Sequence, residues 1–166
     1  MHDALSETQK SALLRDDTHS LLLPPALPIR FPVILICGHG ARDSRCGILG
    51  PILQSAFEKE LAKRGVHADV AQISHVGGHK FAGNVIVYTP PTWGNELAGT
   101  GVWYGRVGPE HVEGLVEETV VRGRIVLGML RGGIMGDGGS LGRVVEAQAA
   151  KENGEEGLRL KPRARG

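Results

Sequence analysis

Residues 33–65 read VILICGHGARDSRCGILGPILQSAFEKELAKRG and place a buried strand shortly before an amphipathic helix. The run at residues 33–36 is apolar and rich in β-branched side chains, which is typical of a strand covered on both faces. Over residues 47–64 apolar side chains recur at helical spacing, and Gly65 is a residue type that ends helices. This strand–helix unit predicts the start of an α/β domain.

The same two patterns continue as far as residue 135. We predict further strands over residues 68–74, 84–88 and 102–107, a helix over residues 109–121, and a short closing element over residues 125–130. Strands that alternate with helices form a sheet covered by helices. Residues 33–135 are therefore expected to fold as one α/β domain.

The two ends of the chain lack this periodicity. Residues 1–32 end in a proline-rich segment, and because proline fixes φ and removes a backbone donor we expect an extended, disordered leader or linker. Residues 136–166 are rich in glycine and poor in large apolar side chains. We expect a largely disordered tail there, with a short helix at residues 144–151.

Composition excludes several classes of function. The 166 residues carry 19 Lys and Arg against 18 Asp and Glu, a net charge of +1, whereas nucleic-acid-binding proteins usually carry a clustered basic surface. No apolar run approaches the roughly 18 residues that span a bilayer. Two cysteines without a signal peptide are not typical of a disulfide-stabilised secreted protein. We therefore interpret Cys37 and Cys46 as intracellular thiols and expect neither nucleic acid nor a membrane span.

Four side chains that bind soft or borderline metals follow two of the predicted strands. Cys37 and Cys46 come after the first strand, and His75 and His79 come after the second. Loops that follow parallel strands gather at one edge of a sheet, and thiolate and imidazole together suit zinc or an iron–sulfur cluster. The two glycines between the histidines indicate a tight irregular loop, because glycine tolerates positive φ.

Ligand spacing alone leaves the metal open. Eight residues separate Cys37 from Cys46, more than in a common zinc knuckle or a dithiol oxidoreductase motif, and Val76 replaces the glutamate of a zinc-protease motif. A structural zinc module without redox activity is one alternative. The stretch GHGARD at residues 38–43 resembles the metal-binding turn of sirohydrochlorin-type chelatases, so a chelatase that uses His39 is a second alternative.

Several blocks together resemble one known family. The blocks are ICGHGARDSRCG at residues 36–47, SHVGGHKFAGNVIVY at residues 74–88, VWYGRV at residues 102–107 and RGGI at residues 131–134. They resemble the sucrase/ferredoxin-like family, in its altered inheritance of mitochondria protein 32 branch. The resemblance implies a thioredoxin-like ferredoxin domain with a central mixed sheet flanked by helices. It also implies an upstream region longer than the leader of this chain.

The resemblance further implies a [2Fe–2S] cluster held by Cys37, Cys46, His75 and His79. Replacing two thiolates by neutral imidazoles makes a cluster easier to reduce, as in Rieske centres, and each imidazole has a second nitrogen that can exchange a proton. We therefore expect an electron carrier or redox sensor, proton-coupled, rather than a stand-alone enzyme. Its partner would be a redox protein, and its location the mitochondrion, with the cytosol as the alternative.

Polar side chains near these ligands are expected to have supporting roles. Arg42, Arg45, Lys80 and Arg106 are predicted to offset negative charge around the cluster or to dock an acidic partner. His39 is predicted to lie in the ligand surroundings rather than to bind the metal, because four ligands are already available.

Overall fold

The computed structural model describes residues 27–159, except for the side chains of His79 and of residues 153–159. Most of the predicted leader (residues 1–26) and the end of the predicted tail (residues 160–166) lie outside the described residues. In chain order the elements, with short 3₁₀ and π turns labelled η, are β1 (Val33–Cys37), α2 (Ser44–Arg64), β2 (Asp69–Ile73), η2 (His79–Phe81), β3 (Val85–Tyr88), β4 (Thr100–Tyr104), η3 (Pro109–His111), α3 (Val112–Leu115), η4 (Val116–Val121), η5 (Leu127–Met129), β5 (Leu130–Met135) and α4 (Leu141–Arg159).

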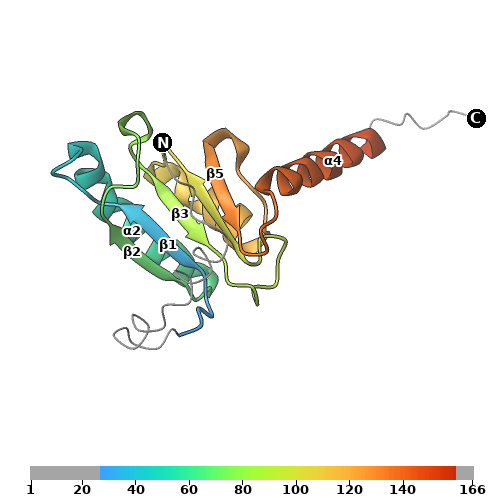
Figure 1. Cartoon of the computed structure of the whole chain (residues 1–166), viewed down its shortest axis with the longest axis horizontal. Coiled ribbons are helices and arrows are strands. Elements are labelled where there is room, and N and C mark those ends of the chain that lie inside the picture. Colours follow the sequence, from blue (N-terminus) through green and yellow to red (C-terminus); the bar gives the residue numbers. More distant parts are fainter. Residues whose placement is uncertain (1–26, 160–166) are drawn as a thin grey trace, which may run out of the picture.

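Five strands form one mixed sheet in the order β2-β1-β3-β4-β5 (Figure 1). β1 pairs in parallel with β2, and the other three pairings are antiparallel. The parallel pair follows from the helix α2 between β1 and β2, because a parallel neighbour requires a long crossover connection. The predicted α/β class and mixed sheet are confirmed.

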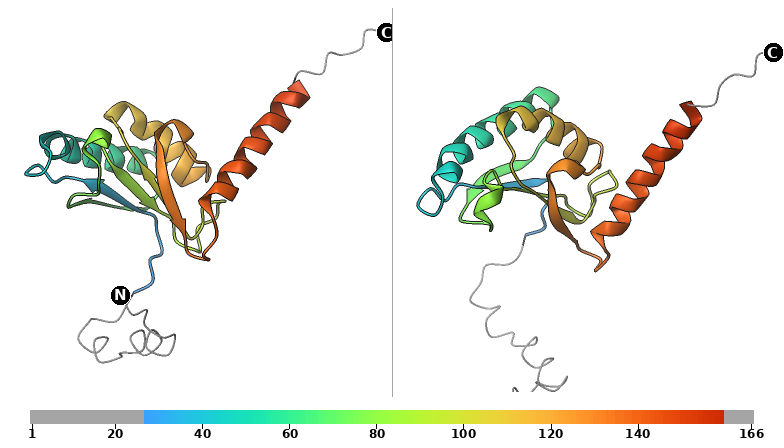
Figure 2. Two further views of the ribbon diagram at one scale, coloured as in Figure 1. Left: turned by 45° about the horizontal axis from the view of Figure 1, so that its top comes forward. Right: turned by 90° about the horizontal axis from the view of Figure 1, so that it is seen from above.

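The helices α2 and α3, together with the π-helical turn η4, cover the same face of the sheet (Figure 2). Side chains alternate between the two faces of a strand, and the covered face receives Ile34 and Ile36 of β1, which are fully buried together with Phe57 of α2. On the opposite face Leu35 and Trp103 are only half-buried. The core therefore lies between the sheet and this helical layer.

Helix α2 begins three residues earlier than predicted. Asp43 has extended backbone angles and its side chain accepts a hydrogen bond from the backbone N–H of Arg45, the contact expected of an N-terminal cap. Cys46 consequently lies in the first turn of α2 rather than in the preceding loop. Gly65 ends the helix in the left-handed conformation with φ 66°, as predicted.

The C-terminal third departs further from the predicted boundaries. The short closing element predicted over residues 125–130 is the turn η5, the last strand follows it over Leu130–Met135, and α4 is longer than the predicted helix at residues 144–151. The backbone N–H of Ile125 donates to the side-chain oxygen of Gln148 at 2.7 Å, and the Gln148 amide donates to the Ile125 carbonyl at 3.0 Å. Ile125 is therefore bound by α4 instead of by a neighbouring strand.

Candidate metal centre

Cys37 is the last residue of β1. It therefore lies at the end of the strands where the predicted ligand loops were expected to gather. Its backbone N–H donates to the Asn84 carbonyl at 3.0 Å, so the chain just before β3 holds the end of β1. The side chain is only 1% exposed. This thiol is therefore protected from water by the sheet itself.

Cys46 is brought back to the same place by a close approach of two glycines. A Cβ atom on Gly47 would lie 2.6 Å from the Cα of Gly40, a separation that real side chains do not adopt. The first turn of α2 can therefore lie directly on the loop at residues 38–43, and Cys46 becomes 2% exposed.

The two thiols lie against each other in this buried position. Burial raises the pKa of the Cys46 thiol, and the hydrogen bond and charge of the Cys37 thiol raise it further, while a backbone hydrogen bond from Gly83 opposes the shift. Both cysteines are free. The protonated form of Cys46 is therefore favoured in the metal-free protein, and metal binding would release its proton.

The histidine loop, which we define as residues 74–84, follows β2. Gly77 and Gly78 have φ values of 64° and 69°, so the tight loop with positive φ predicted between His75 and His79 is confirmed. His75 is half-buried and His79 is the first residue of η2. The side chain of His79 lies outside the described part, so its predicted role as a ligand remains a prediction.

Asn84, the last residue of the histidine loop, contacts the backbone at the end of β1, where Cys37 lies. Its carbonyl accepts from the backbone of Cys37, and its side-chain amide donates to the Gly77 carbonyl at 3.3 Å. Asn84 is 2% exposed, a position in which a polar side chain must satisfy its hydrogen bonds within the protein. The backbone of Asn84 thus holds the end of β1, while its side chain holds the turn at Gly77.

Arg131 of β5 also fixes the histidine loop, and this role was not predicted from the sequence. Its guanidinium donates to the Gly77 carbonyl at 3.2 Å and also to the side-chain oxygen of Asn84, and it lies over the ring of Phe81. The only signal in the sequence was the block at residues 131–134, which is distant along the chain from the ligands.

The remaining predicted residues have three different surroundings. Lys80 and Arg106 lie over the ring of Phe81, at 5.0 and 5.6 Å from its centroid. Arg45 instead forms a two-pronged ion pair with the capping carboxylate of Asp43, with N–O distances of 3.0 and 2.8 Å. Two further predicted residues, His39 and Arg42, are exposed.

The donor types of this region suit zinc or an iron–sulfur cluster. The structure brings the thiols of Cys37 and Cys46 together and places His75 on the histidine loop. Among the described side chains, no three His, Cys, Asp or Glu residues converge on one point where they could hold a metal ion. In a [2Fe–2S] cluster with two protein ligands on each iron, these two thiols would bind one of the irons.

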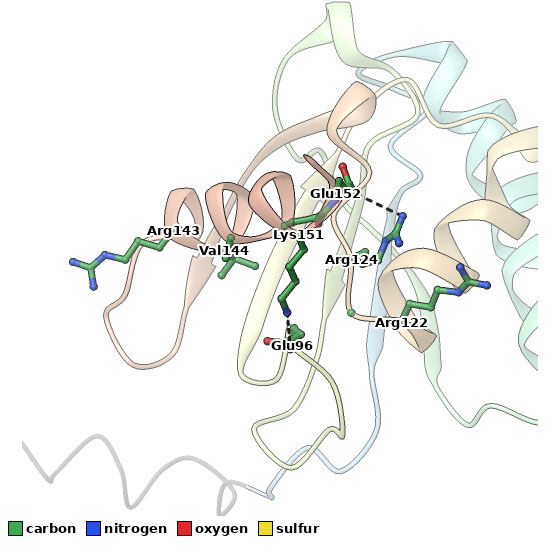
Figure 3. A pocket seen from close by; sticks show the side chains of 10 residues that line it. Glu96, Arg122, Arg124, Arg143, Val144, Lys151 and Glu152 are labelled. Atoms are coloured by element: carbon green, nitrogen blue, oxygen red, sulfur yellow. Dashed lines mark hydrogen bonds and ion pairs between the residues drawn. The ribbon is translucent and has the colours of Figure 1, made fainter. Parts of the chain in front are cut away.

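Cavities outside the thiol pair include one at the histidine loop and one at α4. The first, of about 300 Å³, borders the histidine loop and contains the side chains of Val76, Ile86, Trp103 and Arg131 among its walls. A larger cleft of about 450 Å³ lies between α4 and the segment around Arg122 (Figure 3). Its walls include none of the predicted ligands.

Curated relatives share the region that contains these residues. Over 111 residues the chain is 47% identical to a protein named Altered inheritance of mitochondria protein 32 from Clavispora lusitaniae, covering 65% of this chain and 37% of that protein. The protein of the same name from Debaryomyces hansenii is 49% identical over 100 residues, or 60% of this chain and 35% of the relative. The one from Saccharomyces cerevisiae is 42% identical over 103 residues, or 60% and 32%. The chain spans about a third of the length of these relatives.

Solved structures of a thioredoxin-like [2Fe-2S] ferredoxin from Aquifex aeolicus are similar in fold. The wild-type protein is 21% identical, with a TM-score of 0.44, and the match covers 61% of this chain and 97% of that one. A cysteine-to-serine variant is also 21% identical, with a TM-score of 0.48 and coverage of 60% and 97%.

Two further findings concern membrane spans and family membership. Within residues 27–159, no helix is both long and apolar enough to cross a membrane. The sequence profile described as sucrase/ferredoxin-like matches residues 3–132, most of the 166-residue chain, and the chain therefore belongs to this family.

Proposed function

We propose that this protein binds a [2Fe–2S] cluster through Cys37, Cys46, His75 and His79 and carries single electrons or senses redox state. The observation that supports the proposal most is the pair of adjoining, buried and unbridged thiols at the end of β1 and the start of α2. A bound cluster of this kind supplies a one-electron redox couple whose potential is raised by histidine ligation.

The protein's own residues provide the surroundings that such a centre requires. The sheet and α2 exclude water from both thiols, which keeps a reactive centre from solvent. Asn84 and Arg131 hold the histidine loop by its Gly77 carbonyl. The ligands would therefore be positioned before the metal arrives, and little ordering would accompany binding.

Anaerobic purification after expression with iron tests this proposal. We expect a red-brown protein with visible absorption, a paramagnetic-resonance signal on reduction, and two irons and two sulfides per chain. A matched variant is His111→Ala, which removes a histidine outside the ligand set and should keep the colour. A colourless protein that contains zinc would contradict the proposal and support the structural zinc module, and metal insertion into a porphyrinoid would support the chelatase.

Proton coupling at the histidines is a finer part of the proposal. Reduction adds negative charge next to the imidazoles, so a ring nitrogen that does not bind iron would take up a proton. The midpoint potential should then fall with rising pH by up to about 59 mV per unit, the value for one proton and one electron. A potential independent of pH would contradict the coupling and leave the cluster itself in place.

We also propose that the protein resides in mitochondria and exchanges electrons with a redox protein. The support for this location is the name of the curated relatives, and the cytosol is the alternative. Fusing residues 1–40 to a fluorescent reporter tests whether this segment directs import. A cytosolic reporter would remove the support that this segment provides.

A further inference from the structure

We propose that Lys80, Arg106 and Arg131, gathered around the ring of Phe81, form a docking surface for the acidic face of a partner protein. We call these four residues the Phe81 collar. They come from η2, from the loop after β4 and from β5, and the tertiary fold brings them together. The inference rests on the proposed function in one respect: the collar adjoins His79, so a partner docked there would lie beside the proposed redox centre.

The three charged groups of the collar lie close to one aromatic ring. The charged groups of Arg131, Lys80 and Arg106 lie 4.1, 5.0 and 5.6 Å from the centroid of the Phe81 ring. All three cations are exposed and the ring is half-buried. An aromatic face attracts a cation at such distances, so the ring holds the three positive charges in one small area although they repel one another.

No carboxylate in the described part of the chain neutralises these charges by an ion pair. Several cations elsewhere are paired with carboxylates. In the cleft beside α4, Lys151 lies 3.2 Å from Glu96 and Arg124 lies 3.6 Å from Glu152 (Figure 3). Among the described residues, no carboxylate neutralises the positive charge of the collar. Negative charge on a partner would therefore be attracted to this surface.

The backbone holds Arg106 in an unfavourable conformation. Its φ of 60° is, among the described residues, the one positive value outside glycine, and a non-glycine residue in this region carries strain that is typical of functional sites. Its backbone N–H donates to the Phe81 carbonyl at 3.3 Å, and its guanidinium donates to the Lys80 carbonyl at 3.4 Å. A glycine would relieve the strain but would remove the charge, which supports a role for the side chain.

The surroundings favour a protein over a small anion or a nucleic acid. Arg131 also borders the 300 Å³ cavity, whose walls include Val76, Ile86 and Trp103. Apolar surface beside a charged rim is the arrangement of protein interfaces, and a small inorganic anion would gain nothing from it. The net charge of +1 for the whole chain lacks the excess of positive charge common in nucleic-acid-binding proteins.

A charge-reversal experiment with a net-charge control tests the proposal. The test variant is Lys80→Glu/Arg106→Glu, and the control is Lys59→Glu/Arg143→Glu, which reverses two exposed cations on α2 and α4. Arg131 is left unchanged because it fixes the histidine loop. The probe is a fluorescein-labelled oligoglutamate peptide, whose binding to metal-free and metal-loaded protein is followed by anisotropy at low and high salt.

We expect the native protein to bind the peptide at low salt, the test variant to bind at least about tenfold more weakly, and the control to change by less than about twofold. High salt should abolish the difference, because it screens exposed charges. The variant Lys80→Gln/Arg106→Gln should give an intermediate affinity. Equal weakening in the test and control variants would overturn the proposal, as would tighter binding of anionic lipid vesicles or of a single-stranded oligonucleotide.

A second measurement separates failure of this inference from failure of the proposed function. In metal-loaded protein reduced by dithionite, oxidation by ferricyanide, an anion, should be slower in the test variant than in the control, and oxidation by hexaamminecobalt(III), a cation, should be faster. If the protein holds no cluster this second measurement gives no signal, while peptide binding still reports on the collar. Oxidation rates that are identical in both variants would contradict docking beside the redox centre.

Discussion

The guanidinium of Arg131 lies 4.1 Å from the ring centroid of Phe81 and donates to the carbonyl of Gly77 at 3.2 Å. Strand β5, at the edge of the sheet farthest from β2, is thereby fastened to the loop that carries the two histidines. A planar guanidinium can stack on a ring and donate to two acceptors at once, whereas a lysine ammonium lacks this geometry.

Replacing Arg131 should therefore release the histidine loop. For Arg131→Ala we expect metal-loaded protein to lose its metal to a chelator about 10- to 100-fold faster, the range found when residues that support metal ligands are removed. Arg131→Lys should lie closer to alanine than to arginine. Loss of visible absorption over time measures the rate. Arg143→Ala, an exposed change on α4, is the control, and equal rates in all variants would contradict the role of Arg131.

Substitutions of the cysteine and histidine ligands should have different effects on the cluster. Cys37→Ser or Cys46→Ser is expected to remove the visible absorption, because each thiol belongs to the buried pair. His75→Cys should retain a cluster but lower its midpoint potential, because a thiolate adds the negative charge that a neutral imidazole lacks. Redox titration followed by absorption measures both. An unchanged spectrum in Cys46→Ser would remove that residue from the site.

Two glycine-to-alanine changes in helices should have opposite effects on the free energy of unfolding, because only Gly47 is in close contact with another segment. Gly47→Ala would press a Cβ against the Gly40 backbone and should destabilise the fold by about 1–3 kcal/mol, as overpacking does. Gly114→Ala in α3 meets no atom within 4 Å and should stabilise by up to about 1 kcal/mol, because alanine favours helix. Urea unfolding measures both free energies. A stabilising Gly47→Ala would show that the contact is not close.

Acid should weaken the contact between α2 and η4. The hydrogen bond from Arg122 and the charges of Arg122 and Arg64 lower the pKa of Glu117 from its ordinary value of 4.5, and Arg64 belongs to the last turn of α2. A lowered pKa in the folded state means that the carboxylate stabilises the fold above pH 4.5 and that this contribution is lost as the pH falls through the lowered value.

Glu117→Gln should accordingly reduce the free energy of unfolding at pH 7, and its difference from the native protein should shrink in acid. Urea unfolding at pH 7 and pH 3 measures the two differences. Glu146→Gln, which changes an exposed carboxylate on α4, should have little effect at either pH. A difference for Glu117→Gln that is the same at both pH values would show that the carboxylate charge is not responsible.

Local patterns were sufficient for the first half of the fold. The apolar run of β1 and the helical spacing of α2 come from neighbouring residues, so both elements were found with errors of at most three residues at their ends. The error at the start of α2 came from its cap. The Asp43 carboxylate accepts a hydrogen bond from the backbone N–H of Arg45, so the helix begins before the apolar side chains recur at helical spacing. The short closing element predicted over residues 125–130 is the turn η5, and Ile125 just before it is held by Gln148 of α4.

The candidate ligands follow from residue type, since thiols and imidazoles are few and stand at strand ends. The positions of the two thiols and of the histidine loop depend on long-range contacts, which the hydrophobic periodicity of the sequence does not reveal. The bond from Arg131 to Asn84 joins residues 47 positions apart, and the contact between Gly40 and Gly47 depends on where the capped helix turns back. Residue chemistry therefore identified the candidate ligands, and the packing of the first turn of α2 against the loop at residues 38–43 brought the two thiols together.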